Sequence, residues 1–107
     1  MGQFDNAIKE LQKGNNVIVK PRGNSMRGKI SSGDSVTLKP CDPYKLLPGD
    51  IVLVKVKGRI YLHLVKAMKG AGKNLKIQIG NNKGHINGWT NCNSIYGKAI
   101  EVDGKVL

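Results

Sequence analysis

Acidic residues are few in this sequence. Its 107 residues include seven Asp and Glu against 18 Lys and Arg, so the formal net charge at pH 7 is +11. A charge of this size concentrates polyanions and acidic proteins around the molecule by long-range attraction. The composition therefore makes nucleic acid or an acidic protein a candidate partner, and it carries no information about a reaction.

Aromatic side chains and long apolar runs are also scarce. Aromatic residues form 5% of the chain, which argues against a platform that stacks single-stranded bases on several rings. Residues 1–13 contain no apolar stretch long enough for a signal peptide or a spanning helix. At this length we expect one cytoplasmic domain over residues 1–107, without a membrane anchor.

Cysteine occurs twice, as Cys41 and Cys92, far apart in the chain. In a reducing compartment we expect two free thiols rather than a disulfide. Together with His63 and His85 these residues have none of the recognised local spacings of zinc ligands. We therefore expect neither a metal site nor another cofactor.

Two periodicities divide the chain. Near the N-terminus, apolar residues recur at steps of three and four over Gln3 to Lys13, which predicts one amphipathic helix that Gly14 ends. The rest has the pattern of short strands, the clearest being a hairpin of Ile51–Val56 and Ile60–Lys66 around Lys57-Gly58-Arg59. The sequence predicts a mainly β domain of curved antiparallel sheets over residues 15–107, with residues 1–14 as a helical extension. Further strands are expected at Asn16–Lys20, Val36–Lys39, Leu75–Ile79 and Ser94–Val102.

Ser25 is a candidate nucleophile. A serine attacks only when a base accepts its proton and hydrogen-bond donors stabilise the resulting oxyanion. Ser25 follows Gly23 and Asn24 and precedes Met26 in a tight segment, whose backbone amides could face a substrate carbonyl without interference from side chains. Most serines beside glycine are simply turn residues, so Ser25 alone does not define a site.

Five short segments from Arg22 onward carry a resemblance. They are Gly23-Asn24-Ser25-Met26, Ile30 to Leu38, Leu47 to Val52, Tyr61 to Val65, and Ile95 to Lys98. In this order they resemble the LexA-type and type I signal peptidase-type serine peptidases. The resemblance implies a small domain of curved antiparallel sheets with peptidase activity.

The resemblance also implies roles for individual residues. Ser25 stands at the nucleophile position, and His63 stands where most bacterial members have a lysine base and endoplasmic-reticulum-type members have histidine. Histidine suits this role because its unperturbed pKa near 6.5 leaves it largely neutral at pH 7. The alternative is a structural histidine on a strand face. By the period of two, Tyr61, His63 and Val65 share one face, and Lys66 lies on the other.

Three features depart from the family pattern. Gly28 replaces a proline, which loosens the turn that presents the serine. Gly23 lacks the hydroxyl that some signal peptidases use in the oxyanion hole, so backbone amides alone would serve. The histidine-type members orient their base with a downstream aspartate, and the corresponding region, Gly80 to Trp89, has no carboxylate. The candidates for orienting the imidazole are Asn81, Asn82 and His85.

Asp34, Asp50 and Trp89 are not part of the expected catalytic pair. Asp34 and Asp50 each follow a glycine before a strand, and we expect both to cap backbone amides. Trp89 lies in a segment rich in Gly and Asn, where we expect a loop, with the ring as an apolar plug over the end of the barrel or as a substrate contact.

These features together predict a stand-alone homologue of the catalytic domain, similar to small phage or mobile-element products. Self-cleavage of the LexA type needs an Ala-Gly pair that reaches the serine, and Ala71-Gly72 follows the base in a loop between strands. We therefore expect a Ser25–His63 dyad that cleaves another protein or peptide in trans. The alternative is a degenerate peptidase fold whose basic surface binds nucleic acid or an acidic protein.

Overall fold

The computed structural model describes residues 3–107 as a mainly β domain with one short N-terminal helix, which confirms the predicted fold class. No helix in this part of the chain is long and apolar enough to cross a membrane. The elements are α1 (Asp5–Gln12), β1 (Val17–Val19), β2 (Val36–Lys39), β3 (Ile51–Val56), β4 (Arg59–Lys69), β5 (Lys76–Gly80), β6 (Ile86–Asn91), β7 (Ile95–Val102) and β8 (Lys105–Val106), with 3-10 turns at Pro43–Lys45, Gly72–Asn74 and Cys92–Ser94.

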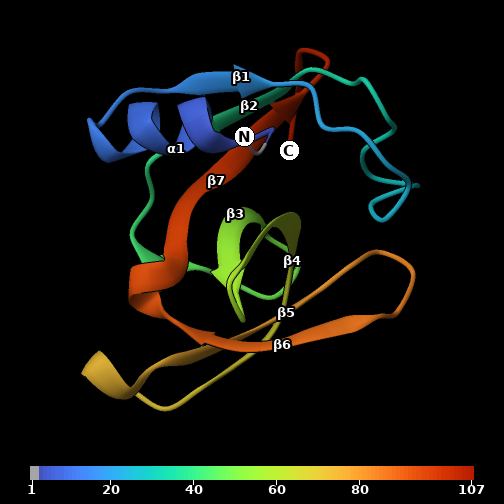
Figure 1. Cartoon of the computed structure of the whole chain (residues 1–107). Helices are drawn as coiled ribbons and strands as arrows, with labels where there is room; N and C mark the ends of the chain where they lie inside the picture. Colours follow the sequence, from blue (N-terminus) through green and yellow to red (C-terminus); the bar gives the residue numbers. More distant parts are fainter. Residues whose placement is uncertain (1–2) are drawn as a thin grey trace.

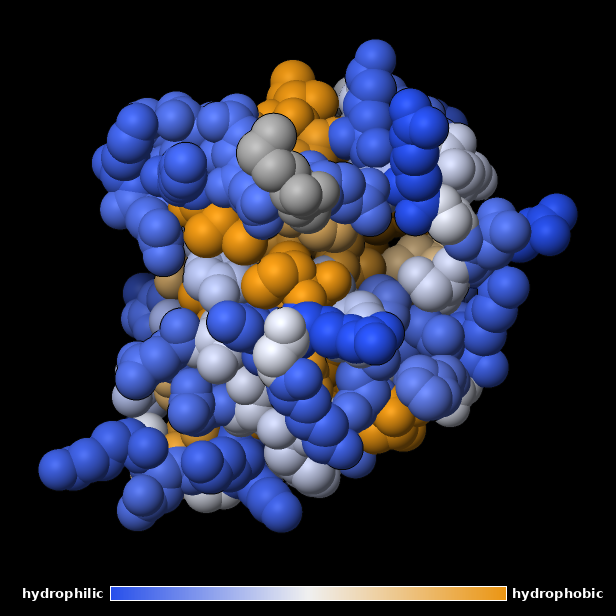
Figure 2. Space-filling model, viewed as in Figure 1, coloured by the Kyte–Doolittle hydropathy of each residue, from blue (hydrophilic) through white to orange (hydrophobic). Residues whose placement is uncertain are grey.

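All strands belong to one antiparallel sheet with the order β1-β2-β7-β3-β4-β5-β6, and β8 pairs with β7. The sheet curls so that α1, β1 and β2 form an upper layer and β5 and β6 a lower one, with the β3–β4 hairpin between them (Figure 1). Thr90 Oγ1 on β6 donates a hydrogen bond to the Lys55 carbonyl on β3 (3.0 Å). This bond joins the last strand of the sheet order back to β3. The face drawn in Figure 2 shows apolar surface between the layers and hydrophilic side chains around it.

The β3–β4 hairpin is apolar on both faces because each face contributes to a separate core. Leu53 lies opposite Leu62, and both pack in the upper core beneath α1. Val52 and Val54 alternate with Leu53 and join Ile77 in the lower core. Lys57 and Gly58 at the turn both have positive φ, of 51° and 82°. This is the backbone geometry of a tight two-residue hairpin turn.

The helix packs closely on β7. Ala7 and Leu11 are buried, and a Cβ at Gly97 would stand 3.0 Å from the Leu11 side chain and 2.7 Å from the Lys39 carbonyl oxygen. Only glycine therefore permits this approach. The helix is two residues shorter at its start than the predicted segment, and Gly14 follows it with φ of 89°.

The main difference from the predicted elements is β6. The sequence predicted a loop around Trp89, whereas Trp89 lies on a strand paired with β5, and its side chain is 38% exposed. The expectation that Trp89 plugs the end of a barrel is therefore wrong. Asn and Gly have low strand propensity, but cross-strand pairing with β5 outweighs it.

Candidate functional site

Ser25 lies on the connection between β1 and β2, in a run of tight turns. The Asn24 carbonyl accepts a hydrogen bond from the Arg27 N–H (3.1 Å), and the Met26 carbonyl accepts one from Ile30 (2.8 Å). The side chains of Met26 and Ile30 are buried in the upper core, at 5% and 3% exposure. The segment is thus anchored directly after the half-buried Ser25.

Asn82, on the loop between β5 and β6, fastens the serine segment to the lower layer. Its backbone N–H donates to the Ser25 carbonyl (3.0 Å), and its side-chain Nδ2 donates to the Arg27 carbonyl (2.8 Å). Gly28 has φ of 99°, which proline cannot adopt, and a Cβ there would lie 3.0 Å from Asn82 Nδ2. The departure from proline at Gly28 therefore accompanies a turn held by Asn82 rather than a loose one.

His63 connects this segment to the hairpin. Its side chain is 6% exposed on β4, and its Nε2 lies 3.0 Å from Ser25 Oγ. Its Nδ1 lies 2.7 Å from Oδ1 of Asn87. An amide oxygen only accepts hydrogen bonds, so Nδ1 carries the proton and Nε2 is left with the lone pair that a general base requires.

Asn87 reaches His63 because of a β-bulge. Ile79 of β5 lies opposite Gly88 of β6, and the next residue, Gly80, lies opposite Ile86. Asn87 is therefore left without a partner on β5. An extra residue of this kind breaks the alternation of side chains and redirects them relative to a regular strand. The bulge thus explains why the Asn87 side chain reaches His63, although Trp89, two residues further along the same strand, is exposed.

None of the three predicted orienting residues hydrogen-bonds to His63, and Asn87 takes that place. Asn81 Oδ1 accepts from the backbone N–H groups of Lys83 and His85 and so closes its own loop. Asn82 holds the serine segment, and His85 is exposed. The three predicted residues lie on the loop before β6, whereas Asn87 lies on β6 itself, and the period of two gives no sign of the bulge there.

The environment of His63 favours the neutral ring. Burial lowers the pKa of His63 below its usual value of 6.5, the hydrogen bond to Asn87 opposes this, and the electrostatic effect of His85 lowers the pKa further. Tyr61 stacks on the imidazole with ring centroids 4.8 Å apart, as expected for neighbours on one strand face. The lowered pKa therefore favours a neutral imidazole at pH 7.

Backbone amides of the serine segment differ in their availability. The Gly23 N–H donates to Ser32 Oγ (3.3 Å), so Gly23 supports the turn and is not a free donor. Within residues 3–107 the N–H of Ser25 has no hydrogen-bond acceptor. This N–H is free to donate a hydrogen bond to an oxyanion. Backbone N–H groups have this role in the oxyanion holes of acyl-transfer enzymes.

A cleft with a volume of ≈ 120 Å³ borders the Ser25–His63 pair. This is room for a small apolar group rather than a large ring. The apolar part of its lining comes from residues of the upper core or packed against it: Phe4, Met26, Ile30, Ile60 and Leu62.

The remaining residues named from the sequence lie away from this chemistry. Asp34 and Asp50 accept hydrogen bonds from the N–H groups of Ser31 (2.8 Å) and Leu47 (2.9 Å), so both cap turns as expected. Lys66 passes over Gly80, on the side of β5 opposite the buried Ile79. Cys41 and Cys92 are free thiols. Among residues 3–107, no three His, Cys, Asp or Glu side chains are grouped so that they could hold a metal ion.

Comparison of the chain with protein-family models finds no match, and comparison with curated proteins finds none either.

Proposed function

We propose that this chain is a serine peptidase that cleaves a peptide bond in another protein or peptide. The observation that carries the proposal is one continuous chain of hydrogen bonds, from Asn87 Oδ1 to His63 Nδ1 (2.7 Å) and from His63 Nε2 to Ser25 Oγ (3.0 Å). Nucleophile, base and a group that orients the base are the three parts of an activated serine. The order of short segments that resemble LexA-type and signal peptidase-type peptidases supports the same assignment.

In the proposed reaction, Ser25 Oγ attacks the substrate carbonyl carbon while His63 Nε2 takes the hydroxyl proton. The carbonyl oxygen becomes an oxyanion beside the free N–H of Ser25. Collapse breaks the C–N bond, and His63 returns its proton to the leaving amine. Water, deprotonated by the same nitrogen, then hydrolyses the acyl-serine ester and restores the hydroxyl.

Asn87 is a positioning residue in this scheme. It fixes the tautomer and the orientation of the imidazole, as the amide of Cys-His-Asn peptidases does. A neutral amide gives the imidazolium less stabilisation than a carboxylate does. We therefore expect slower chemistry than that of a Ser-His-Asp site.

The substrate is proposed to be a separate chain. Ala71-Gly72 lies between β4 and β5, whereas the loop that contacts Ser25 lies between β5 and β6, at the opposite end of β5. Figure 1 shows these two loops on opposite sides of the molecule. Self-cleavage at this pair would need the sheet to unfold, since β5 is buried in the lower core.

Incubation of a proteome-derived peptide library with the protein tests the proposal. Mass spectrometry should find new termini with the wild type that are missing with Ser25→Ala and with His63→Ala, both shown to be folded by circular dichroism. The ≈ 120 Å³ cleft predicts small apolar residues beside the cut. If the wild type gives no termini beyond those of the Ser25→Ala sample, the peptidase assignment fails and a binding role for the fold remains.

A further inference from the structure

The part of the chain from β3 into β7 is rich in positive charge. Residues 51–100 contain no Asp or Glu and nine basic residues. These residues therefore hold most of the net charge of the protein. They are Lys55, Lys57, Arg59, Lys66, Lys69, Lys73, Lys76, Lys83 and Lys98.

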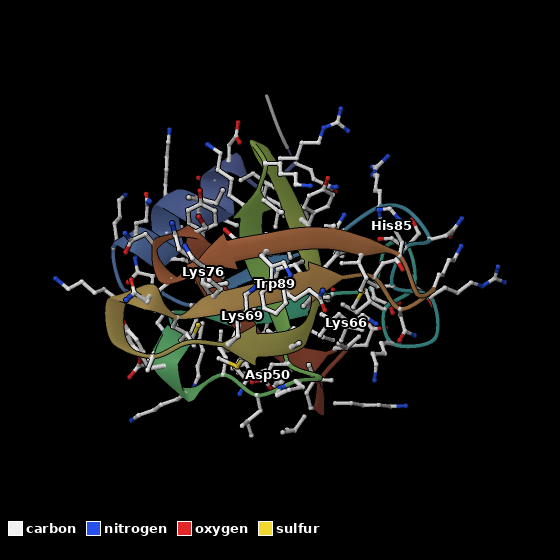
Figure 3. The ribbon with its side chains drawn as sticks, turned by 90° about the horizontal axis from the view of Figure 1, so that it is seen from below. Asp50, Lys66, Lys69, Lys76, His85 and Trp89 are labelled. Carbon is white, nitrogen blue, oxygen red and sulfur yellow. The ribbon has the colours of Figure 1, made fainter. Side chains whose placement is uncertain are left out.

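Three of these lysines gather around the only tryptophan. Lys69 lies opposite Lys76 in the β4–β5 register, and its Nζ lies over the Trp89 ring, 4.3 Å from the ring centre. Lys66 reaches the same side of β5, where it passes over Gly80. Figure 3 views this surface from below and shows Trp89 among Lys66, Lys69 and Lys76. We call these four residues the basic face.

The lysines of the basic face have no carboxylate partner within residues 3–107. The two ion pairs in that part of the chain join Lys13 to Glu10 and Lys98 to Asp50, both outside the basic face. Lys69 and Lys76 are exposed and Lys66 is half-buried. Their charges are therefore available to an anionic ligand.

We propose that the basic face binds single-stranded nucleic acid, with a base that displaces the Lys69 ammonium from the ring of Trp89 and stacks there, and with phosphates beside the lysines. Exposed aromatic rings bordered by cations are the elements of single-strand binding, and they tolerate any base because every base has a flat face. An acidic peptide would use the lysines and leave the 38% exposed ring without a purpose. The scarcity of aromatic residues argued against a platform of several rings, and a face of one ring and three lysines needs no others.

The number of lysines sets the expected dependence on salt. Three phosphate contacts on a single strand give a slope of about −2 for the logarithm of the association constant against the logarithm of salt concentration. Affinity should therefore fall about 20-fold between 50 and 200 mM salt. Loss of one stacked base should weaken binding about 5-fold or more.

Tryptophan fluorescence is a direct readout, because Trp89 is the only tryptophan. Titration with an oligothymidylate should quench this emission in the wild type and in Ser25→Ala alike, since the basic face is separate from the serine. The triple variant Lys66→Gln, Lys69→Gln, Lys76→Gln should bind far more weakly. The matched control Lys9→Gln, Lys20→Gln, Lys39→Gln removes the same charge from exposed residues of the upper layer and should keep most of the affinity.

The ring is tested by anisotropy of a fluorescein-labelled oligothymidylate. Trp89→Ala should lose about 5-fold or more in affinity, and Trp89→Phe should recover much of it. Three results would overturn the proposal: binding without any quenching of Trp89, equal losses in the two triple variants, or equal competition by polyglutamate of the same length. The last result would assign the face to an acidic protein.

Discussion

Substituting Asn87 by aspartate exchanges a neutral acceptor on the His63 ring for a charged one without changing the size of the side chain. Asn87 Oδ1 lies 2.7 Å from His63 Nδ1, and the ring is only 6% exposed. An opposite charge this close raises the pKa of an imidazole by about 1–3 units, or about 1.4–4 kcal/mol. We expect the pKa of His63, which burial now lowers, to rise in Asn87→Asp.

The same carboxylate would stabilise the imidazolium that forms as Ser25 attacks. In chymotrypsin-like peptidases the reverse change, aspartate to asparagine, costs about 10⁴ in kcat, largely because the tautomer is wrong. Here the tautomer is already correct, so only the charge effect is gained. We expect the reaction of Ser25 with a fluorophosphonate to become at least about 10-fold faster at pH values above the raised pKa.

The pKa of His63 can be followed by NMR titration of its ring protons in a His85→Gln background, which leaves one histidine. Asn81→Asp is the matched control, because it adds the same charge on the loop that precedes Asn87, where its Oδ1 contacts only backbone N–H groups. A pKa and a labelling rate that respond equally to both substitutions, or to neither, would refute the role assigned to Asn87.

In the wild type, labelling of Ser25 should rise through a midpoint below pH 6.5 and level off above it, because the pKa of His63 is lowered; a midpoint above 6.5 would contradict this. Because the pKa of His63 is lower in the folded protein, His63 binds a proton more tightly in the unfolded chain. The urea concentration at the midpoint of unfolding should therefore fall as the pH drops below 6.5. Asn82→Ala should slow labelling about 10-fold by releasing the serine segment, with the pKa of His63 unchanged. Gly28→Pro should destabilise the fold by about 3 kcal/mol in urea unfolding, because φ there is 99°. Leu53→Ala, in the upper core, should cost about 2–5 kcal/mol in the same assay.

The parts of the fold that sequence alone predicted are those with local signals. The apolar steps of three and four residues mark α1, and alternation around Lys57-Gly58 marks the β3–β4 hairpin. The pairing of Ser25 with His63 had no local signal, because 38 residues separate them. It was predicted from the order of motifs, and the structure places the two side chains 3.0 Å apart.

The parts that were missed depend on contacts distant in sequence. β6 is poor in strand-forming residues and forms because β5 offers it partners over the lower core. The bulge opposite Ile79 and Gly80 then leaves Asn87 free to reach His63, against the alternation that a regular strand would have. Asn82 was considered as a partner of His63, and its bonds to the serine segment depend on how that loop meets a turn far earlier in the chain.

Covalent labelling of Ser25 by a fluorophosphonate, measured by intact mass and peptide mapping, tests the proposed nucleophile most directly. We predict one adduct per chain, on Ser25, formed by the folded wild type and reduced to background in Ser25→Ala and in His63→Ala. Labelling of Ser25 that persists unchanged in His63→Ala, or no labelling of folded wild type above the Ser25→Ala background, would contradict an activated serine at this site.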